Sequence, residues 1–195
     1  VAANKTAGVE LLPAAGAAGI EAAVNQEVRT AWLKMLAYIY GTVAILCLIA
    51  FRSWRAVLVA LLPLALTSVL CEALMVVLGI GVKVATLPVI ALGVGIGVDY
   101  ALYLLSVQLH GQRMGMPLPE AYRAALAFTG RIVALVGLTL AAGVITWAWS
   151  PIKFQADMGV LLAFMFLWNM LGALILIPAL SYFLLPTSAV RKVSA

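Results

Sequence analysis

The sequence predicts an all-α membrane protein with five transmembrane helices, because it is very apolar, poor in charge and divided into five long apolar runs. Of its 195 residues, 66% are hydrophobic and only 10% are charged, and the mean hydropathy is +1.16. An average soluble domain is about half apolar and roughly a quarter charged. The composition therefore excludes a disordered chain, a nucleic-acid-binding tail and an ordinary soluble enzyme domain, and it indicates that lipid covers much of the surface.

Each apolar run meets the length that a bilayer imposes. A hydrocarbon core about 30 Å thick needs about 20 apolar residues in a helix that rises about 1.5 Å per residue. Helices are required because lipid cannot satisfy exposed backbone groups, and the runs lack the short alternating strands of a β-barrel. The five predicted spans cover residues 32–51, 56–78, 84–109, 132–149 and 158–185.

Basic residues in the short connections predict which way the spans run. Alternate connections and the C-terminal tail carry seven Lys and Arg residues, whereas the opposite connections carry Lys83 and Lys153. The positive-inside rule places the side with more basic residues in the cytoplasm, so we expect a cytoplasmic C-terminus and an N-terminal segment outside. The seven residues are Arg52, Arg55, Arg113, Arg123, Arg131, Arg191 and Lys192.

The chain divides into three predicted parts. Residues 1–30 are rich in Ala and Gly and are expected to end an exported domain, 31–186 form the transmembrane domain, and 187–195 form a cytoplasmic tail. Because the first residue is Val and not Met, we expect the chain to be a piece of a longer protein. Pro117 to Glu120 has the pattern of a helix start. The residues after this start are predicted to form either a short amphipathic helix on the cytoplasmic face or a plain connecting loop.

Asp99 is the first candidate site residue, because it lies well inside the third predicted span. An ionisable side chain in a membrane span costs on the order of 3 kcal/mol and is a functional-site hypothesis by default. We expect this carboxyl group to be protonated for much of the time and to carry protons. The alternative is a neutral acid that only hydrogen-bonds a neighbouring helix. Tyr100, the next residue, could stabilise or relay a proton, or could simply pack between helices.

Three glycines near Asp99 predict close packing of the third span. Gly93 and Gly97 are four residues apart, the spacing of a small-xxx-small contact between membrane helices. Gly95 lies between them and shares another face with Asp99 and Tyr103. All three glycines are therefore candidate packing positions around a polar interior.

Polar residues of other spans are weaker candidates. Thr139 has a predicted depth similar to that of Asp99 and is a possible relay partner, although Thr commonly bonds its own helix backbone. Glu72, nearer the outer end of the second span, either lines a substrate path or bonds a neighbouring helix. Asn169 is interpreted as interhelical glue and His110 as an interfacial residue.

Patterns of enzyme and metal sites are missing from the sequence. It has no GxxxxGK[ST] loop, no HExxH and no Ser–His–Asp arrangement. Cys47 and Cys71 lie in apolar runs without metal-ligand spacing. The segment GIGVD differs by one residue from the GxGD of intramembrane aspartyl proteases, and Asp157 lies at another depth. We therefore expect no enzymatic activity, no metal and no cofactor; the coupling ion, expected from Asp99, is the proton.

Four segments together resemble the resistance–nodulation–division (RND) superfamily, and its MMPL-type branch of hydrophobe exporters in particular. The segments are FRSWRAVLVALLPLALTSVL, TLPVIALGVGIGVDYALYLL, TGRIVALVGLTLAAGV and GVLLAFMFLWNMLGALILIPAL. The resemblance covers roughly residues 30–185, and GVGIGVDY with FRSWR upstream is its most specific part.

The resemblance implies a fold of two similar halves, of which this chain would be the last five spans of one. It implies proton-driven export of lipids, drugs or other amphiphiles across the bacterial inner membrane, with a proton relay at Asp99 and Tyr100. The implied partners are membrane lipids, an amphiphilic substrate, the other half and a possible second copy, but no nucleic acid. The alternative is a non-transporting module that binds lipid or a partner protein, as in sterol-sensing proteins.

Overall fold

The computed structural model describes residues 17–81 and 86–185. Expectations that concern residues 1–16, Lys83 or the tail with Arg191 and Lys192 lie outside the described residues. The described part is helical throughout its length apart from short connections. Seven α-helices are assigned there: α1 Ala17–Phe51, α2 Trp54–Val77, α3 Leu87–Arg113, α4 Leu118–Ala125, α5 Arg131–Ile145, α6 Lys153–Leu171 and α7 Ile177–Leu184.

The predicted count of five spans is confirmed for the described residues. α4 runs through a π-helical turn, Leu126–Gly130, into α5, and α6 runs through a second, Gly172–Leu176, into α7. A 3₁₀ turn, Thr146–Trp149, ends the fourth span. The helices long and apolar enough to cross a membrane are Gln26–Phe51, Trp54–Val77, Leu87–Arg113, Leu118–Trp149 and Lys153–Leu184.

Several helix boundaries extend beyond the predicted ranges, most of all at the starts of the first and fourth spans. α1 starts at Ala17, so part of the range 1–30 is helix that continues without a break into the first span. The segment after Pro117 is also part of a longer helix, since the π-helical turn carries it into α5. Buried Leu118, Ala121 and Ala125 line one side of α4, and this side packs against α3.

Left-handed residues end three of the helices. Arg52, with φ 54°, closes the tight turn between α1 and α2. Gly79, with φ 66°, ends α2, where the Ile80 N–H donates to the Met75 carbonyl oxygen at 2.9 Å. Gly115, with φ 87°, ends α3. Glycine has no Cβ and is suited to this conformation, which explains two of the three positions.

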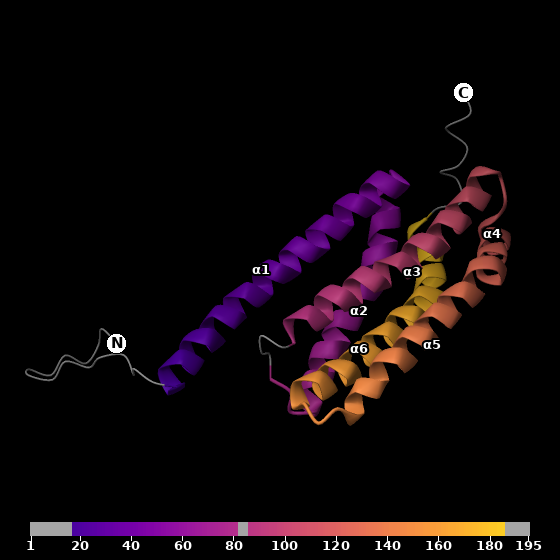
Figure 1. Ribbon diagram of the computed structural model, residues 1–195. Helices are drawn as coiled ribbons and strands as arrows, with labels where there is room; N and C mark the ends of the chain where they lie inside the picture. The colour runs from indigo at the N-terminus through magenta and orange to yellow at the C-terminus, as the bar shows by residue number, and fades with distance from the viewer. Residues whose placement is uncertain (1–16, 82–85, 186–195) are drawn as a thin grey trace, which may run out of the picture.

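α3 and the α6–α7 helix form the centre of the bundle, as Figure 1 shows. In the most apolar window of each span, 56% of the residues are buried for α3 and for α6–α7, against 11% for α1 and 17% for α4–α5. α3 packs against α1, α2, α4 and α6. α1 lies along one edge, and its N-terminal part diverges from the other helices (Figure 1). The outer helices therefore keep wide apolar faces for lipid or other protein.

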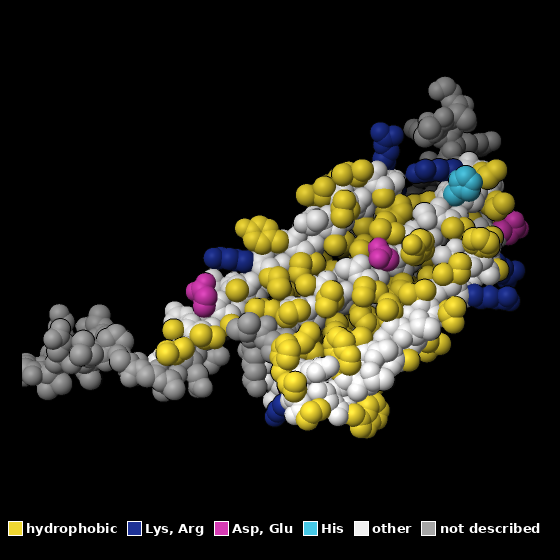
Figure 2. Space-filling model, in the orientation of Figure 1, with side chains coloured by type: hydrophobic (Ala, Val, Ile, Leu, Met, Phe, Trp, Pro, Cys, Tyr) yellow, Lys and Arg dark blue, Asp and Glu magenta, His cyan; other side chains and the backbone are white. Residues whose placement is uncertain are grey.

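Arginines gather where the α1–α2 turn, the C-terminal end of α3 and α4 meet. We call this region the basic end, and Figure 2 shows basic side chains there. Lys153 lies at the opposite end, where α6 begins. The basic end consists of the exposed residues Arg52, Arg55, Arg113, Arg123 and Arg131.

Candidate functional site

One face of α3 is made of small residues and packs tightly against α2 and α6. A Cβ atom added at Gly93 would collide with the Met165 side chain. A Cβ atom at Gly97 would lie 2.5 Å from both Asn169 Nδ2 and Leu64 Cδ2. Such short separations require the neighbouring side chains to move, so glycine allows α3 to approach the other two helices closely.

Gly95 is not a packing position of this bundle, contrary to the sequence-based prediction. It is exposed, and a Cβ atom there would meet no described atom within 4 Å. The residue is turned away from the α6 contact because helix positions two residues apart differ by about 200° in direction. Within this bundle only Gly93 and Gly97 of the three glycines are packing positions.

Asn169 fixes the α3–α6 contact with a buried hydrogen bond. Its Nδ2 group donates to the Gly93 carbonyl oxygen at 2.7 Å, across 76 residues of sequence. The side chain is buried, and its Oδ1 atom has no hydrogen-bond partner among the described residues. The residue therefore acts as the interhelical glue that the sequence predicted, and it also keeps one free acceptor in the core.

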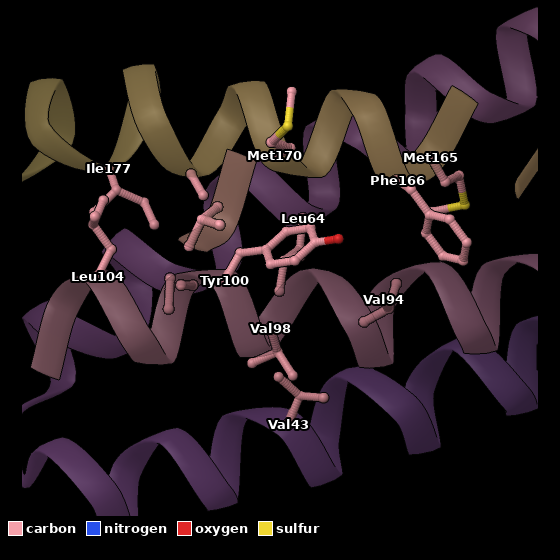
Figure 3. Packing of buried hydrophobic residues seen from close by; sticks show 14 of the residues in the cluster. Val43, Leu64, Val94, Val98, Tyr100, Leu104, Met165, Phe166, Met170 and Ile177 are labelled. Atoms are coloured by element: carbon pink, nitrogen blue, oxygen red, sulfur yellow. The ribbon is translucent and has the colours of Figure 1, made fainter. Parts of the chain in front are cut away.

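Tyr100 and Asp99 point in directions about 100° apart around α3, and Tyr100 is buried whereas Asp99 is exposed. Tyr100 is 2% exposed, and its hydroxyl group lies buried without a described hydrogen-bond partner. In Figure 3 its ring lies beside Leu64, with the hydroxyl directed along α3 toward the Val94 end. The Tyr100 hydroxyl and the Asn169 Oδ1 atom are thus both buried polar groups without a described hydrogen-bond partner.

Asp99 lies near the middle of α3, on the exposed side of the bundle. Among the described residues, the structure records no hydrogen bond and no ion pair to its carboxyl group. Figure 2 shows that the surface over α1 and α3 is mostly hydrophobic, with an acidic side chain set within it. A carboxyl group facing lipid at this depth is costly. This side of α3 is therefore a surface that needs water or further protein beside it.

The structure does not bring Thr139 to Asp99. The Thr139 hydroxyl donates to its own helix, at 2.9 Å from the Leu135 carbonyl oxygen and 3.0 Å from that of Val136. The residue is exposed on α5. Backbone bonding of this kind is common for Thr in membrane helices, and it is the alternative that the sequence left open.

Glu72 lines a hollow of about 460 Å³ between α1 and α2, at the end of the bundle opposite the basic end. We call it the Glu72 hollow; it is lined by Trp32, Glu72, Met75, Val76, Gly79, Ile80 and Gly81. One helical turn from Glu72, Ser68 Oγ lies 2.7 Å from Tyr40 Oη, which also donates to the Leu64 carbonyl oxygen at 3.1 Å. Glu72 is half-buried. The hollow thus combines one acidic side chain with mostly apolar walls, which is the character of a site for an amphiphile.

Replacement of Asn169 by Ala is expected to lower the stability of the bundle by about 1 kcal/mol, in line with hydrogen bonds between membrane helices. The variant loses the bond to Gly93, which joins α6 to α3. Thr139→Ala is the matched control, since the Thr139 hydroxyl joins no second helix. Thermal unfolding of the full-length protein in detergent measures both. Equal melting temperatures for the two variants would contradict the assigned contact.

The fold and this site define a polytopic helical membrane protein with an intramembrane carboxyl group on its central helix. The chain belongs to the MMPL family, which is part of the RND superfamily: the sequence model described as "MMPL family" matches residues 3–191. The resemblance in the four sequence segments is thereby confirmed.

Two curated relatives are similar to the chain. "Putative membrane protein MJ1562" of Methanocaldococcus jannaschii is 28% identical over 138 residues, which cover 71% of this chain and 36% of the relative. "Putative membrane protein SCO6666" of Streptomyces coelicolor is 39% identical over 90 residues, which cover 46% of this chain and 13% of the relative. The matched part is thus about a third of the first relative's length and about an eighth of the second's.

Proposed function

We propose that the chain forms the last five spans of one transmembrane half of a proton-driven exporter of lipids, drugs or other amphiphiles. The main support for this proposal is the position of Asp99. Its carboxyl group lies in the middle of the span, on the side of α3 away from the packed Gly93 and Gly97 face. Family membership supports membrane transport in general. The basic end supports an orientation in which that end faces the cytoplasm of a bacterial inner membrane.

Asp99 would act by changing charge within a low-dielectric environment. A protonated carboxyl group can pack against apolar helices, whereas the carboxylate requires water or polar partners. Each proton that crosses the membrane supplies about 2.3 kcal/mol per 100 mV. Uptake and release of a proton by Asp99 would therefore favour two different packings of α3 against its neighbour. The alternation between these packings would change the conformation of the domain outside the membrane.

The surface around Asp99 indicates a second transmembrane half as the neighbour. The exposed side of α3 includes Gly95, which leaves room for a close helix contact, and Tyr103, which is 61% exposed. Small residues at helix contacts are the usual means of close approach in membranes. A second half of the same protein, or a second copy, would cover the carboxyl group and complete the relay.

Tyr100 would support the relay from within its own half. Its hydroxyl is buried without a described hydrogen-bond partner, and the residue is the next one after Asp99 along the helix. A change in the charge of Asp99 would alter the electrostatic environment of this hydroxyl. Tyr100 therefore would couple the carboxyl group to the α3–α6 contact rather than to a partner carboxylate across the surface.

The decisive experiment places the full-length protein in liposomes that contain a pH-sensitive dye. On imposing a pH step and adding a cationic amphiphile as test substrate, we expect substrate-dependent proton movement that a protonophore abolishes. Empty liposomes are the control. Proton movement equal to that of empty liposomes, across a panel of amphiphiles and lipids, would refute the exporter.

The second candidate is a module that binds a lipid without transport, and the Glu72 hollow favours it because its walls are mostly apolar. For that function, binding of a fluorescent amphiphile would be insensitive to the proton gradient, and it would cause no proton movement.

In the exporter, by contrast, the Glu72 hollow would be part of the substrate path, and Glu72→Gln would raise the half-saturating concentration of a cationic amphiphile.

A further inference from the structure

A polar stripe runs along one side of α3 from Asp99 to the basic end. Its members lie three or four residues apart, so they share one side of the helix, and each is exposed. The buried side of α3 is mostly apolar or small, and its polar members include Gln108 and Gln112. We call this set the α3 polar stripe; it consists of Asp99, Tyr103, Ser106, His110 and Arg113.

The part of the stripe nearer the basic end lines a hollow between α1 and α3. The hollow has a volume of about 330 Å³ and is walled on the α1 side by Ala50 and Phe51. Figure 2 shows the histidine next to a basic side chain where α3 ends, beside a largely hydrophobic surface. The α3 residues that line it are Leu102, Tyr103, Ser106, Leu109, His110 and Arg113.

The groups along the stripe can pass a proton from one to the next. Tyr and Ser hydroxyl groups both donate and accept hydrogen bonds. Ser106 Oγ donates to the Tyr103 carbonyl oxygen at 3.0 Å, so its lone pairs can accept a proton, and it passes a proton onward by releasing this bond. Steps of three or four residues correspond to about 4.5–6 Å along the axis, which a side chain and one water can bridge. Histidine is the side-chain type that gains and loses protons near neutral pH.

We propose that the α3 polar stripe is the route by which protons leave Asp99 for the basic end, with His110 as the last acceptor in the protein. This proposal rests on the proposed function. The Asp99 carboxyl group gives up its proton and becomes a carboxylate. Water and the hydroxyls of Tyr103 and Ser106 transfer it, the His110 imidazole accepts it as imidazolium, and bulk water then takes it.

Other charges near His110 come from α3, from α4 and from the α1–α2 turn. Arg113 lines the same hollow, whose α1 wall is the uncharged Ala50 and Phe51, and exposed Arg52 follows Phe51 in the turn. α4, which packs against α3, carries exposed Glu120 and Arg123. A basic residue at the mouth helps the excess proton to leave toward solvent, since like charges repel.

The test is proton flux through the full-length protein in liposomes, with His110→Ala against Lys153→Gln as the control. We expect His110→Ala to lower substrate-dependent proton flux by about tenfold or more, and Lys153→Gln to change it less than twofold because exposed Lys153 lies at the end of the bundle opposite the basic end. Imidazole added on the side of the basic end should restore at least half of the lost flux in His110→Ala. A histidine that only supports structure would not respond to imidazole.

Tyr103→Phe removes one hydroxyl of the stripe, and Tyr38→Phe is its control on α1, where Tyr38 is 75% exposed. We expect a several-fold lower flux only for Tyr103→Phe. The proposed route is overturned if His110→Ala retains wild-type flux, if imidazole restores nothing, or if both tyrosine variants behave alike. Flux that needs Asp99 but not His110 would refute the route alone, whereas a wild-type protein without proton flux would refute the exporter as well.

Discussion

Asp99→Asn is expected to abolish proton-coupled transport by the full-length protein while the protein still inserts and folds. Asparagine has nearly the same shape as aspartate but cannot take up and release a proton. The carboxyl group is exposed on α3 and has no hydrogen bond or ion pair recorded with described residues, so its loss removes no contact of the bundle. We expect transport to fall by about 100-fold or more, the scale of losing a proton-transferring group.

Asp157→Asn is the matched control for this variant. Asp157 is an acid of the same kind at the start of α6, near the end of the bundle opposite the basic end. Transport and melting temperature are measured for both variants in the same liposomes and detergent. Asp99→Asn with normal gradient-driven transport would exclude Asp99 as the proton carrier, and a large fall in melting temperature would show that Asp99 supports packing instead.

The five spans could be predicted because membrane thickness sets a length that a sequence either has or lacks. The first and last residues of the helices were harder to predict from the sequence. Nothing in a hydropathy pattern distinguishes a surface helix after Pro117 from one that continues into the next span. The π-helical turn Leu126–Gly130 makes that continuation possible, and the Tyr122 hydroxyl, which donates to the Leu174 carbonyl oxygen at 2.8 Å, ties it to the other π-helical turn.

The sequence also predicted that Asp99 and Tyr100 differ by about 100° around the helix, since this angle is set by helical geometry. Which of them is buried depends on the neighbours of α3. The bulky side chains of Met165 and Leu64 lie against Gly93 and Gly97, and this contact turns Tyr100 inward and Asp99 outward. The alternating glycines in GVGIG are compatible with several rotations of α3 about its axis. The pattern alone therefore could not show that Gly95, unlike Gly93 and Gly97, does not pack within the bundle.

Hydrogen-bond partners were the least predictable part of the site. Thr139 and Asn169 both have polar groups that can bond their own helix or another one. Thr139 bonds its own backbone, and Asn169 reaches Gly93 on α3. The α3 polar stripe could have been recognised from its spacing of three and four residues. The sequence did not single it out because His110, at the end of the span, fits an interfacial residue equally well.

Gly97→Val is expected to destabilise the α3–α6 contact, whereas Gly95→Val is expected to be tolerated by the bundle. At Gly97 the first added carbon already lies 2.5 Å from Asn169 Nδ2 and from Leu64 Cδ2, and valine adds two methyl groups beyond it. Asn169 would have to leave its 2.7 Å bond with Gly93, and Leu64 would have to move. Overpacking of this kind costs about 1–3 kcal/mol.

The pair of variants separates packing within this bundle from contact with a second half. Thermal unfolding in detergent should show a clearly lower melting temperature for Gly97→Val and little change for Gly95→Val, because no described atom lies within 4 Å of a Cβ at Gly95. In liposomes, Gly95→Val should nevertheless reduce transport, since the valine side chain would keep the helix of the second half from packing closely beside Asp99. Equal melting temperatures would contradict the assigned faces of α3, and unimpaired transport by Gly95→Val would argue that no helix packs closely on this side.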